Sequence, residues 1–277
     1  MKILVTGASA FVGSNFLKKL IIEKKQFKFY IISRQNLDSE NTNVQFLKTD
    51  LFNFKKIDGY IKKIKPDFLI HFAWITTPNS YQNSEENYKW LEFSIKLLKS
   101  FILNGGKHSV MIGSGNEKKV KLINETLDTY TITKHCLYLF SKKIALANNI
   151  SFMWFRLPYM YGPMEAKERL VSFLIHKAKK NENIILHYPN RFIPLMHIND
   201  VVSQLLKNCF NNKSTVKDIL PPEETNILTL AKKIITFTNS SSIILDTNDN
   251  EISSTEIRQL PVDVEKGLRQ YIIEIRT

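Results

Sequence analysis

Residues 5–14, VTGASAFVGS, join an apolar run to an amphipathic segment, and the architecture of the chain can be worked out from them. Residues 2–6, KILVT, are typical of a short buried strand, and apolar residues recur at helical spacing between positions 16 and 21. The turn reads Gly7-x-x-Ala10-x-x-Gly13, with alanine in place of the usual middle glycine. Such a turn places helix N–H groups where they can hold a pyrophosphate. The pattern predicts a dinucleotide-binding turn, with a purely structural turn as the alternative.

Strands and helices continue to alternate after this unit. Further strands are predicted at 27–33, 44–51, 66–74, 108–114 and 150–157, and helices at 57–65, 84–103 and 130–148. Because each strand is apolar throughout, the sheet should be parallel and covered by helices on both faces. We therefore expect the α/β class, with a Rossmann-type doubly wound parallel sheet.

The alternation weakens after about residue 160. A loop and helix, a strand-like SSIIL at 241–245 and a last helix at 262–274 are predicted there. We expect a dinucleotide-binding Rossmann domain at 1–160 and a smaller substrate-binding C-terminal lobe at 161–277. Residues 195–212 are expected to return and pack on the Rossmann domain.

The composition limits the class of protein and its partners. The chain has 277 residues, is 43% hydrophobic and carries a formal net charge of +13. This charge favours an anionic partner, either nucleic acid or a phosphorylated ligand, although scattered lysines would also suit a solvated surface. The two cysteines, Cys136 and Cys209, have no metal or redox spacing. No apolar run suits a signal peptide or a membrane span, so we expect a soluble cytoplasmic protein with no membrane partner and no metal.

The end of the second predicted strand bears on cofactor choice. In dinucleotide folds an acid at this place binds the ribose 2′-OH, whereas an arginine accommodates a 2′-phosphate. Here Ser33 and Arg34 follow, and no acid occurs before Asp38. NADP(H) is therefore favoured and NAD(H) is the alternative. Arg34 could also be one of the many surface charges of a basic chain, with no role in cofactor binding.

Several further segments, in order, carry a resemblance to a known family. They are LKTDLFN with Asp50, PDFLIHFAW, YTITK, FRLPYMYGP and MHINDVV, following VTGASAFVGS. The chain resembles an extended short-chain dehydrogenase/reductase, in the NAD-dependent epimerase/dehydratase branch that modifies nucleotide-sugars. The likeness covers residues 1 to about 202, and 203–277 match only loosely.

Two tyrosine–lysine pairs occur at a spacing of four, Tyr130 with Lys134 and Tyr138 with Lys142. The spacing alone arises by chance in a lysine-rich chain, because it only places two side chains on one helix face. The resemblance implies that the catalytic tyrosine follows a strand that ends in Ser or Thr, as Ser114 does. Tyr138 lies two turns, about 12 Å, beyond Tyr130. The resemblance thus implies the catalytic set Ser114, Tyr130 and Lys134.

The proposed chemistry requires these residue types. A free tyrosine has a pKa of about 10, and an adjacent ammonium favours the tyrosinate. The resemblance implies that Lys134 also binds the nicotinamide ribose and that Ser114 holds the reacting oxygen. His71 is expected to be a packed residue of the fold.

The resemblance implies further contacts. Asp50 would bind the adenine amino group, and Arg191 the nucleotide phosphates; Tyr159 stands where many relatives have asparagine. The implied cofactor-binding residues are Gly7, Ala10, Phe11, Val12, Gly13, Arg34, Asp50, Leu51, Ala73, Tyr130 and Lys134. The implied substrate-binding residues are Thr76, Ser114, Tyr159 and Arg191.

The expected activity is NADPH-dependent reduction of a nucleotide-linked keto-sugar, for example a 4-keto-6-deoxy sugar. Family dehydratases place two carboxylates directly after the catalytic Ser or Thr, whereas Gly115 and Asn116 follow Ser114 and Glu117 comes one place too late. Elimination is therefore not expected. The alternatives are a nucleotide-sugar C4 epimerase with retained NAD, and a non-catalytic cofactor-sensing or RNA-binding protein. No localised basic stripe supports binding of nucleic acid.

The resemblance also implies a homodimer. Its expected interface is formed by the helices at 84–103 and 130–148. The first of these carries an apolar stripe of Leu91, Ile95, Leu98 and Ile102, although burial in the core would explain the stripe equally well.

Overall fold

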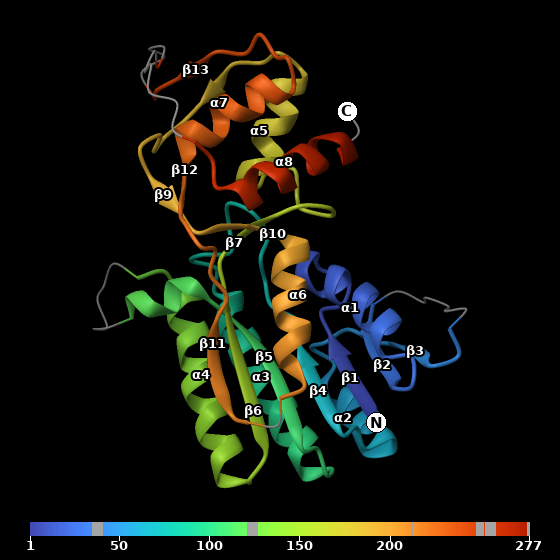
Figure 1. Ribbon diagram of the computed structural model, residues 1–277. Coiled ribbons are helices and arrows are strands. Elements are labelled where there is room, and N and C mark those ends of the chain that lie inside the picture. The colour runs from blue at the N-terminus through green and yellow to red at the C-terminus, as the bar shows by residue number, and fades with distance from the viewer. Residues whose placement is uncertain (35–40, 121–126, 212, 248–251, 253–258, 276–277) are drawn as a thin grey trace. The chain divides into compact units, whose positions relative to one another are not determined.

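A computed structural model describes the chain except for residues 35–40, 121–126, 212, 248–251, 253–258 and 276–277 (Figure 1). The chain divides into two compact units. The first comprises Met1–Leu157 and Val202–Ile219, and the second Pro158–Val201 and Leu220–Thr277. The returning segment of the first unit thus begins at Val202 and ends at Ile219, against an expected 195–212. No helix in the described part of the chain is long and apolar enough to cross a membrane.

The first unit is built on a seven-stranded sheet whose neighbouring strands all pair in parallel. Its strands are β1 (Lys2–Thr6), β2 (Lys28–Ser33), β3 (Val44–Lys48), β4 (Phe68–His71), β5 (His108–Ser114), β6 (Ser151–Leu157) and β11 (Thr215–Asp218). The order is β11-β6-β5-β4-β1-β2-β3. The predicted Rossmann-type α/β class is confirmed. The sequence did not predict β11, because its short TVKD stretch lacks the apolar character of the other strands.

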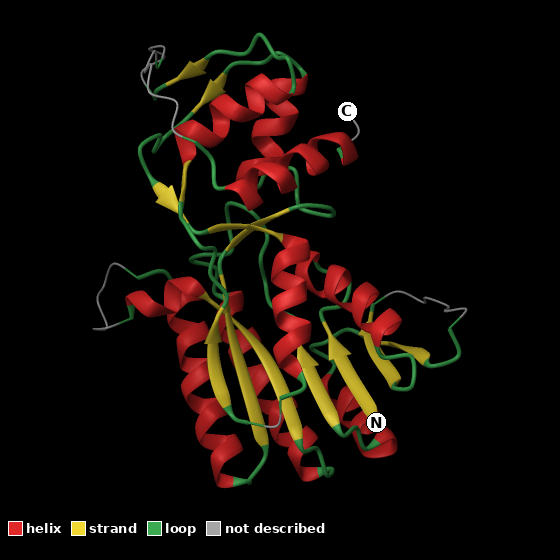
Figure 2. Ribbon diagram, in the orientation of Figure 1, coloured by secondary structure: helices red, strands yellow, loops and turns green. Residues whose placement is uncertain are grey.

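Helices cover both faces of this sheet (Figure 2). On one face lie α2 (Phe54–Ile64), α3 (Glu86–Leu103) and α4 (Thr129–Ala147), whose buried residues form one core cluster with the sheet. The opposite face carries α1 (Phe11–Glu23) and the part of α6 (Ile198–Cys209) that follows Val202. Lys19 of α1 donates to Ser203 of α6 at 2.9 Å. The sheet is therefore buried on both faces, as its apolar strands require.

The strand order reverses direction between β1 and β4. From β1 the chain continues outward through β2 and β3, and after β4 it continues outward on the other side through β5 and β6. The crevice at the carboxyl ends of strands at such a reversal is where this class of sheet binds ligands. We therefore expect the ligand site among the residues that follow β1, β4 and β5.

The apolar stripe predicted as a dimer surface packs within its own subunit. Leu98 is fully buried, and Leu91, Ile95 and Ile102 pack against the core cluster of the sheet. The stripe is therefore core, and it does not argue for an interface. The homodimer stays a prediction.

The second unit contains short strands and three helices among its described residues (Figure 1). Its strands pair as β10 (Leu195–His197) with β7 (Tyr159–Tyr161), β12 (Thr225–Asn226) with β9 (Phe192–Ile193), and β13 (Ile244–Leu245) with β8 (Ile184–Ile185). Its helices are α5 (Leu170–Lys179), α7 (Ile227–Phe237) and α8 (Val262–Glu274). The bounds of α8 match the predicted last helix, whereas α7 was not predicted. Leu174, Leu230 and Leu268, one from each helix, are fully buried in a common core.

Candidate active site

The glycine turn brings the first strand and the first helix into close contact. Gly7 has a φ of 75°, and a Cβ there would lie 2.4 Å from the backbone nitrogen of Ala73. A Cβ on Gly13 would lie 2.2 Å from the carbonyl oxygen of Gly7. Both positions therefore require glycine. The first glycine allows the positive φ, and the second allows the helix to approach the strand.

The N-terminus of α1 is suited to an anionic ligand. Its N-cap is Ala10, whose side chain makes no capping hydrogen bond, and no acidic residue lies in the first turn. The N–H groups of Phe11, Val12 and Gly13 belong to the turn that has no partner inside a helix. Because these groups point outward at the positive end of the helix dipole, they fit the pyrophosphate of a dinucleotide.

Other predicted cofactor residues follow the carboxyl ends of neighbouring strands. Arg34 follows β2 directly and is exposed. After β3, Asp50 accepts a hydrogen bond from the Phe52 N–H at 2.8 Å, and Leu51 packs against the core. Ala73 is buried beside Gly7 after β4, and Thr76 is exposed a few residues later. The sheet thus brings these residues to the same edge. Asp38 lies outside the described residues.

Ser114 is the last residue of β5 and caps the short helix η1 (Gly115–Lys119). Its Oγ accepts a hydrogen bond from the Asn116 N–H at 3.2 Å, and its own N–H donates to Glu117 Oε1 at 2.6 Å. The Ser-x-x-Glu spacing is that of a capping box. The serine is therefore fixed in place at the carboxyl end of a central strand.

Tyr130 lies in the first turn of α4, and its N–H donates to the carbonyl oxygen of Gln82 at 2.8 Å. Its ring meets that of Tyr81 edge to face, with the centroids 4.9 Å apart. This contact and the hydrogen bond to Gln82 set the position of the tyrosine. Asp128 caps the same helix by accepting from the Thr131 N–H at 2.8 Å.

Lys134 lies one turn after Tyr130 and points into the protein. Its side chain is buried, and Nζ donates to the carbonyl oxygen of Ile112 at 2.8 Å. Nζ also lies 4.1 Å from the centroid of the Trp74 ring, within the range of a cation–π contact. Burial lowers the pKa of Lys134 to about 7, and the Glu117 carboxylate acts in the opposite direction. Because Ile112 and Ser114 both belong to β5, the lysine and the serine are anchored to one strand.

The second tyrosine–lysine pair lies in a different environment. Tyr138 is buried, its ring centroid is 5.6 Å from that of Trp154, and Arg156 lies over its face. His71 is also buried, between the hydroxyls of Thr6 and Ser94. Burial lowers the pKa of His71 to about 3, so it remains neutral at physiological pH. Tyr138 and His71 therefore pack as parts of the fold.

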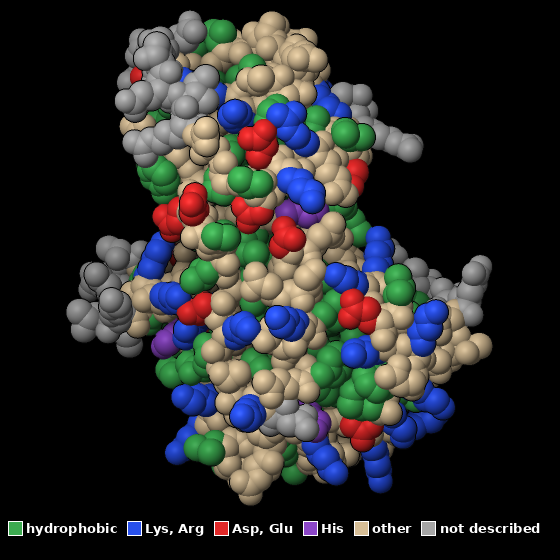
Figure 3. Space-filling model, in the orientation of Figure 1, with side chains coloured by type: hydrophobic (Ala, Val, Ile, Leu, Met, Phe, Trp, Pro, Cys, Tyr) green, Lys and Arg blue, Asp and Glu red, His purple; other side chains and the backbone are tan. Residues whose placement is uncertain are grey.

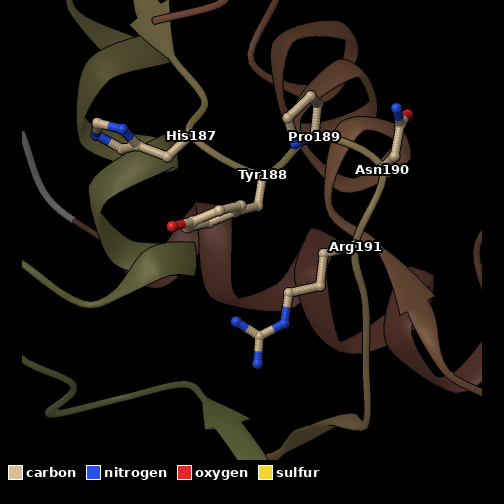
Figure 4. A pocket seen from close by; sticks show the side chains of 5 residues that line it. All are labelled: His187, Tyr188, Pro189, Asn190 and Arg191. Carbon is tan, nitrogen blue, oxygen red and sulfur yellow. The ribbon is translucent and has the colours of Figure 1, made fainter. Parts of the chain in front are cut away.

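Two predicted substrate residues come together in the second unit. Arg191 Nη2 donates to the Tyr159 hydroxyl at 3.1 Å. A pocket of about 500 Å³ is lined by residues 187–191, and Tyr188 and Arg191 project to the same side of this segment (Figure 4). Tyr188 is 70% exposed and was not predicted. The sequence signal for it is weak: an aromatic residue three positions before an arginine.

Glu117 and Trp74 were also missed as neighbours of the catalytic set. The Ser-x-x-Glu spacing could have predicted that Glu117 binds the Ser114 backbone. No local signal could have placed Trp74 over Lys134, because 60 residues separate them in the chain.

On the face shown in Figure 3, Lys and Arg side chains are dispersed among other side chains and form no single stripe.

These observations define a Rossmann-type protein with a glycine turn after β1 that fits a dinucleotide, and with Ser114 on β5 and Tyr130 and Lys134 on α4. Residues 3–219 match the NAD dependent epimerase/dehydratase family, and the chain belongs to this family. The predicted family is thereby confirmed. The family depends on a nicotinamide cofactor, as its name states.

Similar proteins act on nucleotide-sugars, according to their names. GDP-6-deoxy-D-talose 4-dehydrogenase of Aggregatibacter actinomycetemcomitans is 27% identical over 241 residues, covering 77% of this chain and 73% of that protein. dTDP-D-glucose 4,6-dehydratase of Dictyostelium discoideum is 24% identical over 276 residues, covering 84% of this chain and only 61% of that protein. The crystal structure of UDP-glucose 4-epimerase from Thermotoga maritima with UDP-glucose gives a TM-score of 0.78 at 18% identity. That match covers 99% of this chain and 98% of the epimerase, and it shows a shared fold.

Proposed function

We propose that this protein is an NADPH-dependent reductase of a nucleotide-linked keto-sugar, for example a 4-keto-6-deoxy sugar. The similarity to a 4-dehydrogenase of a GDP-linked sugar supports the substrate class and an oxidoreductase reaction. The chemistry is supported by Ser114 at the end of β5, by Lys134, whose Nζ binds the Ile112 carbonyl of the same strand, and by Tyr130 one helical turn before Lys134 on α4. Their contacts would place a hydroxyl, a proton donor and a cation at one site.

The cofactor would be held by the turn after β1 and by the following strand ends. The N–H groups of Phe11, Val12 and Gly13 would bind the pyrophosphate, and Asp50 the adenine amino group. Leu51 and Ala73 would pack beside it. When bound, the reduced nicotinamide supplies the hydride. Arg34 is the basis for proposing NADPH, since an arginine at this place can pair with a 2′-phosphate.

In the proposed step Ser114 Oγ holds the carbonyl oxygen of the sugar, and Tyr130 donates a proton to the same oxygen. The ammonium of Lys134 favours the tyrosinate that remains after proton transfer. Thr76 is proposed to contact the sugar. In the second unit, Arg191 with its partner Tyr159 is proposed to bind the nucleotide phosphates, because a guanidinium can donate two parallel hydrogen bonds to them.

The observation that carries reduction over dehydration is the state of Glu117. Family dehydratases need a free acid and base after the catalytic Ser or Thr. Gly115 and Asn116 supply neither, and both oxygens of Glu117 accept hydrogen bonds from the protein, from Ser114, Trp154 and Arg156. Glu117 is thus engaged in the fold. We therefore place reduction ahead of elimination of water.

A nucleotide-sugar C4 epimerase is the second candidate, supported by the likeness of the fold to UDP-glucose 4-epimerase. The two candidates differ in cofactor use. A reductase consumes NADPH in proportion to product, whereas an epimerase keeps NAD bound and interconverts sugars without net consumption.

The test is incubation of the purified protein with NADPH and a panel of nucleotide-linked 4-keto-6-deoxy sugars, while NADPH absorbance is followed. We expect stoichiometric loss of NADPH with at least one sugar. Parallel incubations with nucleotide-linked hexoses and no added cofactor, analysed by chromatography, test for epimerisation. Interconversion without consumption of NADPH would favour the epimerase, and inactivity in both assays would overturn the proposal.

A further inference from the structure

The Glu117 carboxylate is surrounded by N–H donors. Its Oε1 accepts from the Ser114 N–H at 2.6 Å, and its Oε2 from Trp154 Nε1 at 3.0 Å and Arg156 Nε at 3.4 Å. Glu117 is 1% exposed. These donors come from β5 and from the neighbouring strand β6, so the carboxylate ties the ends of two central strands to the catalytic serine.

The backbone beside Glu117 leaves room for this carboxylate. A Cβ on Gly113 would lie 2.2 Å from Glu117 Oε1 and 2.3 Å from Trp154 Nε1. Any larger residue at this position would displace the carboxylate or the indole. Gly113, Ser114 and Glu117 therefore form one structural unit, in which the glycine admits the carboxylate and the carboxylate holds the serine.

Lys134 is a buried cation held to the same part of β5 as this carboxylate: its Nζ donates to the Ile112 carbonyl at 2.8 Å, two residues before Ser114, whose N–H donates to Glu117 Oε1. A buried ammonium is costly unless an opposite charge compensates it. Burial lowers the pKa of Lys134, and the Glu117 charge raises it; burial likewise raises the pKa of Glu117, against the effects of its donors and of Lys134. Every hydrogen bond described for the two Glu117 oxygens comes from an N–H group. Such a set of donors favours the ionised carboxylate, which only accepts hydrogen bonds.

We infer that Glu117 is a positioning residue, whose carboxylate fixes Ser114 at the end of β5 and supplies the negative charge that keeps Lys134 protonated. This inference builds on the proposed function, because it assigns Glu117 a role through the serine and lysine of the reaction. A protonated Lys134 is what favours the tyrosinate of Tyr130 during proton transfer.

Other ionisable groups around this cluster do not take over the role. Arg156 adds positive charge, and it also pairs with Asp218 at 3.6 Å. Asp218 in turn pairs with Lys118 at 2.6 Å. Burial lowers the pKa of both His71 and His135, so neither adds charge at neutral pH. Among the described residues, Glu117 is the carboxylate that acts on Lys134.

The test is a titration of Lys134 that does not depend on any substrate. The protein is labelled with [ε-¹³C]lysine, the Lys134 signal is assigned by its loss in Lys134→Arg, and its shift is followed by NMR as pH rises. In Glu117→Gln we expect the midpoint to fall by about one pH unit or more, since the compensating charge is gone. Asp218→Asn is the matched control. It removes a carboxylate that pairs with Arg156 and Lys118 and has no described effect on Lys134, so the Lys134 midpoint should stay within about 0.3 pH units of the wild type.

Glu117→Asp serves as a second variant, because it keeps the charge while shortening the reach to Ser114. Its Lys134 midpoint should stay near that of the wild type even if its turnover falls. If Glu117→Gln does not give a folded protein by circular dichroism, a wild-type-like midpoint in the aspartate variant supports the inference and a shifted midpoint overturns it. An unchanged midpoint in a folded Glu117→Gln also overturns it. Once a substrate is identified, the pH at which kcat/KM changes on the alkaline side of its profile should shift together with the Lys134 midpoint. The NMR titration needs no substrate, so its result holds even if the keto-sugar assay fails.

Discussion

Each unit of the protein holds a glutamate with a raised pKa, Glu117 buried and Glu165 partly buried, and the surroundings of the two side chains differ. Glu117 in the first unit accepts three N–H hydrogen bonds and lies near the cations of Lys134 and Arg156. Glu165 in the second unit lies near the Arg169 cation and has hydrogen-bonding neighbours in Gly162, Ser172 and Tyr271. Its buried Oε2 nevertheless has no hydrogen-bond partner among the described residues, and burial raises its pKa to about 8. Burial raises the pKa of both carboxyls; hydrogen bonds on both oxygens of Glu117 oppose that rise, whereas the buried Oε2 of Glu165 receives none from the described residues.

Two tyrosines, one in each unit, also differ in their surroundings. Tyr130 lies at the start of α4, one turn from a lysine and at the carboxyl edge of the sheet. Tyr161 is fully buried, donates to the carbonyl oxygen of Val264 at 2.9 Å, and burial raises its pKa. Burial of a titratable group therefore does not by itself mark a site. Position at a strand end and compensation of charge are needed as well.

Removal of the Tyr130 hydroxyl should have the largest effect. Proton delivery by a positioned group contributes about 10²–10⁴-fold to rate, so Tyr130→Phe should lose about that much turnover while still binding NADPH. Tyr138→Phe and Tyr161→Phe should keep nearly all of it, because both hydroxyls serve packing. Turnover with the keto-sugar and NADPH fluorescence would be measured for each variant. An active Tyr130 variant beside an inactive Tyr138 variant would show that the wrong pair had been chosen.

Replacement of Arg34 tests the cofactor side of the first unit. A charge-assisted pair with a 2′-phosphate is worth roughly 1.5–3 kcal/mol, so Arg34→Ala should weaken NADPH binding by about 10- to 100-fold. NADH binding should hardly change, because NADH carries no 2′-phosphate. Fluorescence titrations with the two cofactors measure the difference. Equal weakening for both would mean that Arg34 does not read the 2′-phosphate.

The pH dependence of stability tests the second unit and should give the smallest effect. The folded protein holds the Glu165 proton up to a pKa of about 8, whereas the unfolded chain releases it near the ordinary value of 4.5. The contribution of Glu165 to stability should therefore fall as pH rises from about 4.5 to 8, since at this group the unfolded state binds fewer protons in this range. Glu165→Gln cannot ionise, so it should be more stable than the wild type at pH 8 by about 1 kcal/mol. This value is well below that of the full shift, because solvent and lost hydrogen bonds reduce it.

Urea unfolding at pH 5 and pH 8 measures this difference. Glu168→Gln is the matched control, because Glu168 is exposed and three residues away. It should follow the wild-type pH dependence. A Glu165→Gln variant with the wild-type slope would show that Glu165 titrates normally, and the contrast with Glu117 would then be lost.

The sequence alone determined the Rossmann-type sheet, its six apolar strands, the glycine turn and the family. These features depend on a few neighbouring residues: a strand needs a local apolar run, and Gly7 needs its backbone freedom wherever the rest of the chain lies. The return of the chain was expected from the sequence at 195–212, whereas the structure gives Val202–Ile219. The seventh strand, β11, could not be predicted, because TVKD has no strong local pattern; it depends on the space left at the edge of β6.

Only the tertiary structure decided the surroundings of the reacting groups. The sequence shows Glu117 three places after Ser114, but Trp154 and Arg156, which bind its carboxylate, come from a strand about forty residues later. Lys134 meets Ile112 and Trp74 only because α4 packs on the sheet. Burial and electrostatic compensation are sums over neighbours in space, so they set the ionisation of Glu117 and Lys134 once the fold is complete.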